Sequence, residues 1–191
     1  EMCGNATRCV GKYVYDRGLT DKTQITLETL AGIKILDLNV KDGEVQTVRV
    51  NMGSPELVPK NIPIDSNLDR FISEDVEVDG KVYKVTGVSM GNPHAVTFID
   101  DTDSLEIEKI GPKFETHKLF PKKINTEFAQ IVDRNTIKMR VWERGAGETL
   151  ACGTGACATM VAANLNGLVD DEADLVLLGG TLHIKWDKNE N

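Results

Sequence analysis

The feature that most constrains the fold of this chain is an internal repeat between its two ends. A Cys-Gly pair opens each copy, at Cys3 and at Cys152, and a Gly-Leu pair follows 15 residues later, at Gly18 and at Gly167. In each copy a helix-like run lies between the pairs, and two β-rich runs separated by a glycine come after them. Two copies of one helix-strand-strand pattern at equal spacing predict two similar structural units. The alternative, that Cys-Gly opens two helices by accident, does not account for the equal spacing.

The two copies differ in what precedes them. About a hundred residues of strand-rich sequence lie ahead of the second Cys-Gly pair, whereas two residues lie ahead of the first. We therefore expect residues 1–51 to be the remnant of an N-terminal domain and residues 52–191 to be a nearly whole C-terminal domain. The turn-forming cluster Gly53-Ser54-Pro55 marks the joint between them.

The remaining sequence predicts mainly strands. Runs rich in Val, Ile, Thr and Phe predict strands at residues 46–52, 81–89, 95–100, 126–132 and 136–142. The repeats add strands at 24–29, 33–38, 173–178 and 181–186, and helices at 6–17 and 155–166. Asp79-Gly80 predicts a hairpin turn, and residues 104–110 predict a short helix that Gly111-Pro112 stops. The fold class is therefore α+β, with a few helices packed inside or against a strongly curved antiparallel sheet.

Each Cys-Gly pair lies just before a predicted helix, where backbone N–H groups lack partners and carry partial positive charge. Such a position lowers the pKa of a cysteine and favours its thiolate. It also binds the carboxylate of a substrate. Glycine beside each cysteine lets the backbone approach a ligand closely, and Asn5 and Thr154 are suitable capping residues.

Two such sites related by the repeat suit an amino acid held between two thiols. One thiolate would remove the α-proton from one face, and the opposite thiol would deliver a proton to the other face. The helix ends would stabilise the charge that develops on the carboxylate. A symmetric acid–base pair of this kind suits a reaction whose substrate and product are mirror-related at one carbon. Cys9 and Cys157 lie inside the helices and are interpreted as small buried hydrophobic residues.

Other kinds of site and partner find less support. The spacings Cys-x5-Cys and Cys-x4-Cys are not the usual zinc-ligand pattern, so no metal site is predicted. No lysine is marked as a pyridoxal Schiff base, and we expect no cofactor. The net charge of −8 argues against nucleic acid as a partner, and no apolar run approaches the roughly 20 residues of a membrane span. The cysteine usage favours a reduced, cytoplasmic location.

Five motifs follow one another along the chain. They are Glu1-Met2-Cys3-Gly4-Asn5 with Thr7-Arg8-Cys9, Gly91-Asn92-Pro93-His94, Asn125-Thr126-Glu127-Phe128, Trp142-Glu143-Arg144-Gly145, and Glu148-Thr149-Leu150-Ala151-Cys152-Gly153-Thr154-Gly155. In this order they resemble the active-site signatures of the diaminopimelate epimerase family, and the resemblance covers essentially the whole chain. It implies two pseudo-symmetric domains, each a curved, mainly antiparallel sheet around a central helix, with the active site between them and the first domain incomplete.

The resemblance also implies a function and roles for individual residues. The enzyme would be a cofactor-independent two-base epimerase that interconverts LL- and meso-diaminopimelate in lysine and peptidoglycan-precursor biosynthesis. Cys3 and Cys152 would be the catalytic acid–base residues. Gly4, Asn5, Gly153 and Thr154 would bind the carboxylate at the reacting centre. Asn92, Asn125 and Arg144 would bind the distal carboxylate, Glu143 would bind the distal ammonium, and His94 and Glu143 would tune the thiol pKa values. The partner would be the small-molecule substrate, and the full-length protein would be a homodimer.

The chain departs from the family pattern in three places. Ala6 stands where the family often has glycine, which is a small change. Nothing in the chain matches the N-terminal segment of the family, which supplies further Asn and Gln contacts to substrate. The chain also ends short of the final segment of the family. On this interpretation the fragment alone can be inactive.

Two alternative functions stay open at this point. A proline or hydroxyproline racemase uses the same two-cysteine chemistry. Those enzymes tend to carry His where this chain has Asn5, and they do not need Arg144 and Glu143 to hold a distal amino-acid head. A non-catalytic redox-sensing or binding module would instead join Cys3 and Cys152 in a disulfide. His94 beside Pro93 also suits a structural turn, and Glu143-Arg144 also suits an ordinary surface pair.

Overall fold

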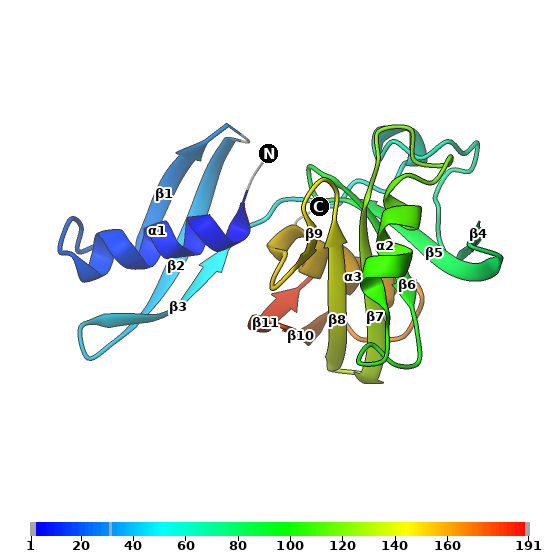
Figure 1. The fold of residues 1–191 in the computed structure, drawn as a ribbon. Coiled ribbons are helices and arrows are strands. Elements are labelled where there is room, and N and C mark those ends of the chain that lie inside the picture. Colours follow the sequence, from blue (N-terminus) through cyan, green and yellow to red (C-terminus); the bar gives the residue numbers. More distant parts are fainter. Residues whose placement is uncertain (1–2, 31, 190–191) are drawn as a thin grey trace. The chain divides into compact units, whose positions relative to one another are not determined.

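The computed structural model describes residues 3–30 and 32–189 (Figure 1). The chain divides into two units, Glu1–Gly53 and Ser54–Asn191, each with its own sheet. Of the first motif, Glu1 and Met2 lie outside the described residues. None of the helices in residues 3–30 and 32–189 is long and apolar enough to cross a membrane.

The first unit is one helix on a three-stranded antiparallel sheet. Its elements are α1 (Gly4–Asp16), β1 (Gln24–Thr29), β2 (Gly32–Lys41) and β3 (Glu44–Val50), with strand order β1-β2-β3. Only one side of α1 is buried, at Gly4, Thr7 and Gly11. A Cβ added at Gly11 would lie 2.9 Å from the Leu36 side chain, so glycine lets the helix lie close to β2. The sheet therefore covers one face of α1.

Within residues 54–189, the second unit contains two α-helices, one short 3₁₀ helix and an eight-stranded sheet. Its elements are η1 (Pro59–Asn61), β4 (Glu74–Val78), β5 (Lys81–Ser89), β6 (Pro93–Phe98), α2 (Ile107–Glu115), β7 (Asn125–Asp133), β8 (Thr136–Glu143), β9 (Gly147–Thr149), α3 (Gly153–Leu165), β10 (Glu172–Leu177) and β11 (Gly180–Lys185). The strand order is β11-β10-β8-β7-β6-β5-β4, with β9 paired to β8. The pairs β6–β7 and β8–β10 are parallel and the other pairs are antiparallel. The predicted α+β class with mainly antiparallel sheet is confirmed.

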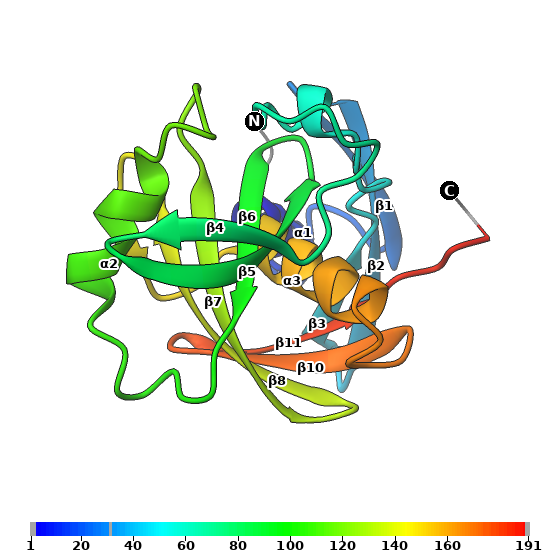
Figure 2. The ribbon, with the colours of Figure 1, turned by 90° about the vertical axis from the view of Figure 1, so that its right-hand side faces the viewer.

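The two helices of the second unit pack on opposite faces of this sheet. Phe128 of β7 contacts the core that holds α2, whereas the next residue, Ala129, contacts the core that holds α3, as alternating side chains of a strand require. Residues 154–163 of α3 are all buried, which confirms the predicted buried helix. Figure 2 shows α3 with strands β5, β6, β10 and β11 curving around it. The sheet thus holds the start of α3 in a fixed position.

The two copies of the repeat have matching local structure. Cys3 and Cys152 are the N-cap residues, with φ of −116° and −124° and ψ of 102° and 110°. Gly18 and Gly167 lie just after the two helices, with φ of 68° and 70°. The leucine after each glycine donates its N–H to a carbonyl five residues back, at 2.9 and 3.0 Å. Both helices begin directly after the cysteine, two residues earlier than predicted. The helix-strand-strand pattern of the repeat is therefore present in both copies.

The predicted strands are all present, with ends displaced by up to three residues. The Asp79-Gly80 hairpin is confirmed, because both residues have the positive φ, 56° and 77°, that a type I′ turn requires. Strand β9 was not predicted, since three residues carry too little pattern.

The prediction for helix α2 is wrong in its bounds. The helix begins at Ile107, not at residue 104, and continues through Gly111 and Pro112 to Glu115. Its buried side includes Phe114, which is fully buried. A Cβ at Gly111 would lie 2.4 Å from the ring of Trp142, so glycine here serves close packing and does not end the helix. Packing on the sheet thus outweighs the hydrogen bond lost at the proline.

Candidate active site

The two predicted catalytic cysteines lie in different surroundings at the starts of their helices. Cys3 is exposed, and its carbonyl accepts a hydrogen bond from the Thr7 hydroxyl at 2.9 Å. Cys152 is buried, with 6% of its surface exposed. Its Sγ accepts the N–H of Gly155 at 3.3 Å and lies 3.4 Å from the Thr154 hydroxyl. The thiol of Cys152 is therefore held in place by the first turn of α3.

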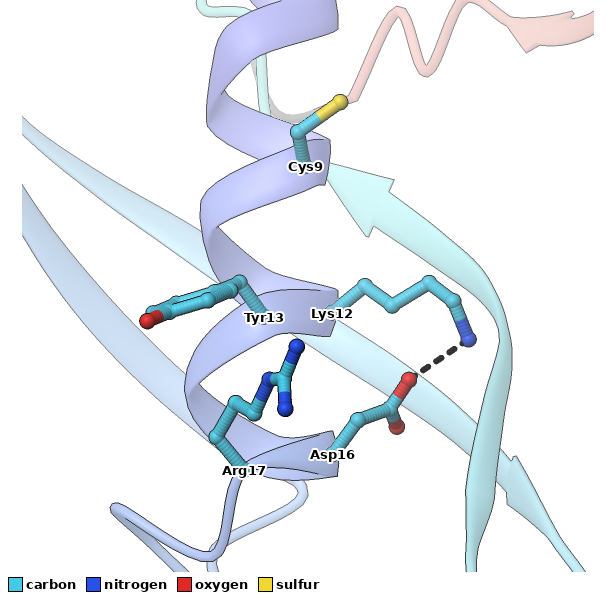
Figure 3. Close-up of a pocket in the computed structure, with 5 residues that line it drawn as sticks. All are labelled: Cys9, Lys12, Tyr13, Asp16 and Arg17. Carbon is cyan, nitrogen blue, oxygen red and sulfur yellow. Dashed lines mark ion pairs between the residues drawn. The ribbon is translucent and has the colours of Figure 1, made fainter.

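The other two cysteines also differ from each other. Cys157 is buried, as predicted, whereas Cys9 is exposed, so the interpretation of Cys9 as a buried residue is wrong. The physical reason is that the three-stranded sheet covers only the opposite side of α1. Figure 3 shows the shallow pocket on this exposed side, which is lined by Cys9, Lys12, Tyr13, Asp16 and Arg17. None of the predicted site residues lines it.

A chain of hydrogen bonds connects four predicted residues in the second unit. The Nε2 atom of His94 lies 3.1 Å from Oδ1 of Asn92, and Nδ2 of Asn92 donates to the Thr154 hydroxyl at 3.1 Å. The same hydroxyl lies 3.4 Å from Sγ of Cys152. His94 itself is fully buried. The histidine therefore reaches the cysteine through two intervening side chains, and this contact favours a site role over a simple turn role.

The pKa of Cys152 is raised to about 12, which is opposite to our expectation for a helix N-terminus. Burial of the thiol is the largest cause, and the negative charge of Glu127 is the second. The hydrogen bonds from Thr154 and from the N–H of Gly155 act in the other direction, while the charge of Glu143 adds to the increase. The favourable helix end is thus outweighed by burial and by two nearby carboxylates.

The residues predicted to hold the distal end of the substrate lie at the start of β6, the start of β7 and the end of β8. Asn125 at the start of β7 is 3% exposed and pairs in register with His94 of β6. Its Nδ2 donates to the Pro93 carbonyl at 2.8 Å, and its Oδ1 accepts the backbone N–H of Arg144 at 2.9 Å. The Arg144 guanidinium donates to the carbonyl of Lys122 at 3.2 Å. Asn125 therefore fixes the backbone that carries Arg144.

Glu143 ends strand β8 beside this point. Its carboxylate accepts a hydrogen bond from the hydroxyl of Thr149 on the facing strand β9. Glu143 is half-buried, and its charge acts on the Cys152 thiol as described above. The structure thus brings Asn92, His94, Asn125, Glu143, Cys152 and Thr154 to one end of the sheet in the second unit.

The predicted residues of the first unit lie on the first turn of α1. Gly4 is buried and Asn5 is half-buried. The Asn5 Oδ1 atom accepts a hydrogen bond from Nη2 of Arg8 at 2.7 Å. Among the described residues, no group of His, Cys, Asp or Glu side chains is arranged to hold a metal ion.

Glu115, which the sequence did not single out, anchors the loop that carries Arg144. Its carboxylate accepts hydrogen bonds from Nε1 of Trp142 at 2.8 Å, from the N–H of Gly145 at 3.1 Å and from Nζ of Lys123 at 3.0 Å. Burial is the largest single influence and raises the pKa of Glu115, but these three donors together outweigh it and hold the pKa below its ordinary value. The ionised carboxylate therefore stabilises the loop.

We expect Glu115→Gln to lower the free energy of unfolding by about 1–2 kcal/mol at pH 7, because charge-assisted hydrogen bonds are lost. The folded-state pKa of Glu115 is depressed, so the stabilisation is fully present above the unfolded value of about 4.3. It disappears as the pH falls through the folded value. Urea unfolding of both proteins at pH 7 and near pH 3 should show the difference shrink. An equal difference at both pH values would contradict this role.

A second residue that the sequence analysis passed over is Glu127 of β7. It lies within a quoted motif but received no role. Two signals could have identified it. It is a carboxylate in a strand whose first five residues, 125–129, are all buried. It also lies two positions after Asn125, which places both side chains on the same face of the strand.

A sequence profile described as diaminopimelate epimerase matches residues 1–58 and 86–191. Curated diaminopimelate epimerases are similar to the chain along its length. The protein of Acetivibrio thermocellus is 61% identical over 191 residues, covering 100% of this chain and 68% of the relative. The protein of Methanococcus maripaludis is 55% identical over 188 residues, covering 98% of this chain and 68% of the relative.

Solved structures share the fold at low sequence identity. A probable proline racemase from Agrobacterium radiobacter K84 aligns with a TM-score of 0.70 at 15% identity, covering 94% of this chain and 57% of that chain. A hydroxyproline epimerase from Agrobacterium vitis aligns with a TM-score of 0.68 at 13% identity, covering 93% and 56%. A PhzF-family phenazine biosynthesis protein from Bacillus anthracis gives a TM-score of 0.63 at 18% identity, covering 99% and 69%. At these identities the likeness shows the fold alone.

Proposed function

Because this chain belongs to the diaminopimelate epimerase family, we infer that it is an isomerase that interconverts LL- and meso-diaminopimelate in lysine and peptidoglycan-precursor biosynthesis. The observation that carries this function is the 61% identity with a diaminopimelate epimerase over all 191 residues. The repeated Cys-capped helix is consistent with it, since inversion at one carbon calls for two similar acid–base groups.

We propose that Cys3 and Cys152 are the two catalytic residues. The thiolate of one cysteine takes the α-proton, and the electron pair of the broken C–H bond remains on the substrate. The thiol of the other cysteine gives its proton to the opposite face, so one S–H bond breaks as the new C–H bond forms. One sulfur gains a proton and the other loses one, and their roles exchange in the reverse direction. The support is that each cysteine is the N-cap of a helix, where developing negative charge is favoured.

The carboxylate at the reacting centre would be held by the first turns of α1 and α3, at Gly4, Asn5, Gly153 and Thr154. Backbone N–H groups at a helix start lack intrahelical partners and suit a carboxylate. The Thr154 hydroxyl already contacts Asn92 and Cys152, so we assign the substrate contact of Thr154 to its backbone N–H.

The distal carboxylate of the substrate would be bound by Asn92, Asn125 and Arg144, and the distal ammonium by Glu143. The support is the cluster described above, in which Asn125 fixes the backbone of Arg144. We propose that His94 tunes the Cys152 thiol through Asn92 and Thr154, and that Glu143 tunes it by its charge, which raises the pKa of Cys152.

Three further statements stay predictions. The full-length protein would be a homodimer, it would work in the cytoplasm, and residues 1–51 and 52–191 would belong to the N-terminal and C-terminal epimerase domains. Sedimentation of the complete protein would check the first, and cell fractionation the second.

The main alternative, a proline or hydroxyproline racemase, differs in the substrate it accepts. We expect the complete protein to convert LL-diaminopimelate with a kcat/KM at least about a hundredfold above that for L-proline, because proline offers no partner to Arg144 and Glu143.

In Arg144→Lys the planar two-pronged donor is lost, and KM for diaminopimelate should rise about tenfold or more.

The matched control for this experiment is Arg134→Lys. Arg134 is exposed, and its ion pair with Asp170 lies on the surface, so its replacement should leave KM unchanged. Equal turnover of proline and diaminopimelate, or equal KM effects of the two substitutions, would overturn the substrate assignment.

A further inference from the structure

Strand β7 carries a carboxylate in the interior of the second unit. The side chain of Glu127 is fully buried, and its Oε1 lies 2.7 Å from Nδ1 of His94. Among the described residues, Oε2 has no hydrogen-bond partner. A buried charge is costly unless it is paired, and here only half of the carboxylate is paired. Such a group calls for an explanation beyond stability.

Glu127 lies against the first turn of α3, next to the proposed catalytic thiol. A Cβ added at Gly155 would be 2.6 Å from Oε1 of Glu127 and 3.2 Å from Sγ of Cys152. The carboxylate and the sulfur therefore border the same small space, which exists because residue 155 is glycine. The N-terminal end of α3 offsets part of the cost of a negative charge there.

The hydrogen bonds of His94 show what this carboxylate does to the ring. Nε2 faces the carbonyl oxygen of Asn92, whose Nδ2 donates to Thr154, so Nε2 carries a proton. Nδ1 lies 2.7 Å from Oε1 of Glu127, so the carboxylate orients the ring from its other side. Both ring nitrogens are thus engaged, and His94 acts on Cys152 only through Asn92 and Thr154.

We propose that Glu127 is a positioning residue of the site, which fixes the orientation of His94 and keeps a negative charge against Cys152, so that Cys152 is the proton-donating member of the cysteine pair in the free protein. This inference rests on the proposed role of Cys152 in epimerisation. It assigns a resting proton to the sulfur at the start of α3.

The charges that face the Cys152 thiol agree with this assignment. Burial raises the pKa of Cys152 most, and the charge of Glu127 from β7 raises it next. Glu143 from β8 adds to the increase, while the Thr154 hydroxyl and the first turn of α3 oppose it. His94 from β6 is turned toward Glu127 and Asn92. Of the two carboxylates, Glu127 has the larger effect.

The test is the rate at which iodoacetamide alkylates each cysteine, followed by peptide mass spectrometry in wild type and in Glu127→Gln. Loss of the negative charge should lower the pKa of Cys152 by about one unit, so Cys152 should react about tenfold faster at pH 8. Cys157, buried in the same helix, reports on any general opening of the protein and should react at an unchanged rate. In Glu127→Asp, which keeps the charge, the rate should return toward wild type.

A control variant and an NMR measurement separate a positioning role of Glu127 from a structural one. Glu148→Gln breaks a partly buried ion pair with Arg140 in the same unit and should leave the Cys152 rate unchanged. In nitrogen NMR of the imidazole, the Nδ1 signal of His94 should shift in Glu127→Gln and stay unchanged in Glu148→Gln, because Glu127 contacts that nitrogen.

An unchanged or slower Cys152 rate in Glu127→Gln, or equal acceleration of Cys152 and Cys157, would overturn the proposal. If that variant does not fold, a rate of Cys152 alkylation in the wild-type protein that already levels off below pH 8, as for a thiolate, would overturn it in its place. None of these measurements needs turnover, so they remain decisive even if the proposed epimerase activity fails its own test.

Discussion

Replacing either Cys3 or Cys152 with alanine is expected to lower kcat for diaminopimelate epimerisation by about 10³-fold or more, because each change removes one of the two acid–base groups. With one sulfur missing, a proton can be taken from or given to only one face, so inversion stops. The two losses should be similar in size and should not add in the double variant, since the pair acts as a unit. The measurement is the initial rate of meso product formation in the complete protein.

The chain provides a matched control for each of these substitutions. Cys9→Ala lies on the same helix as Cys3, and Cys157→Ala lies on the same helix as Cys152. Each control removes one sulfur without removing an N-cap thiol, and we expect it to keep kcat within a few-fold of wild type. Near-normal epimerisation by Cys3→Ala or Cys152→Ala would contradict the assignment of that cysteine.

Replacing Phe114 with alanine is expected to destabilise the second unit by about 3–5 kcal/mol, the usual cost of deleting a buried aromatic ring. The Phe114 side chain is fully buried, with 0% of its surface exposed to solvent. Its ring meets Tyr83 and Phe128 edge-on, with centroids 5.1 and 5.4 Å apart. These contacts hold α2 on the sheet, and Glu115 of the same helix holds the Arg144 loop. Urea unfolding at pH 7 measures the loss.

Leu178→Ala is the control for this stability prediction. Leu178 lies in the turn between β10 and β11 and is 57% exposed, so its truncation should change the free energy of unfolding by about 0.5 kcal/mol or less. Similar losses in Phe114→Ala and Leu178→Ala would show that α2 is not part of a shared core.

Elements whose ends depend on a few adjacent residues could be predicted from the sequence. Asp79-Gly80 adopts the positive φ values of its turn type whatever surrounds it. Gly18 and Gly167 end their helices in the same way, because a residue with positive φ is needed at each position. The Cys-Gly starts were predicted for the same reason, although both helices begin two residues earlier than expected.

Elements whose state depends on distant packing were misjudged. Gly111-Pro112 signals a helix end locally, yet α2 runs through it because Trp142 fits against the glycine. Cys9 has the spacing of a buried helical residue, yet it is exposed because the sheet of the first unit covers the other side of α1. Neither partner surface can be read from residues nearby in sequence.

At the candidate site, too, the sequence predicts the individual residues but not the contacts that depend on distant packing. The motifs named Asn92, His94, Thr154 and Cys152 separately, but their hydrogen-bond chain exists only because β6 and the start of α3 meet in the fold. The sign of the Cys152 pKa shift was wrong, because burial and the charge of Glu127 are tertiary effects that the helix end does not reveal.

In the proposed mechanism, two different sulfurs serve the two faces of one carbon. The most direct test is the position of deuterium during early turnover of LL-diaminopimelate by the complete protein in D₂O. With two sulfurs, meso product should carry deuterium at the inverted carbon while recovered LL substrate stays unlabelled, because the sulfur that removes the proton is not the one that delivers it. Deuterium entering recovered substrate as fast as it enters product would rule out the two-sulfur mechanism, since a single group would then serve both faces.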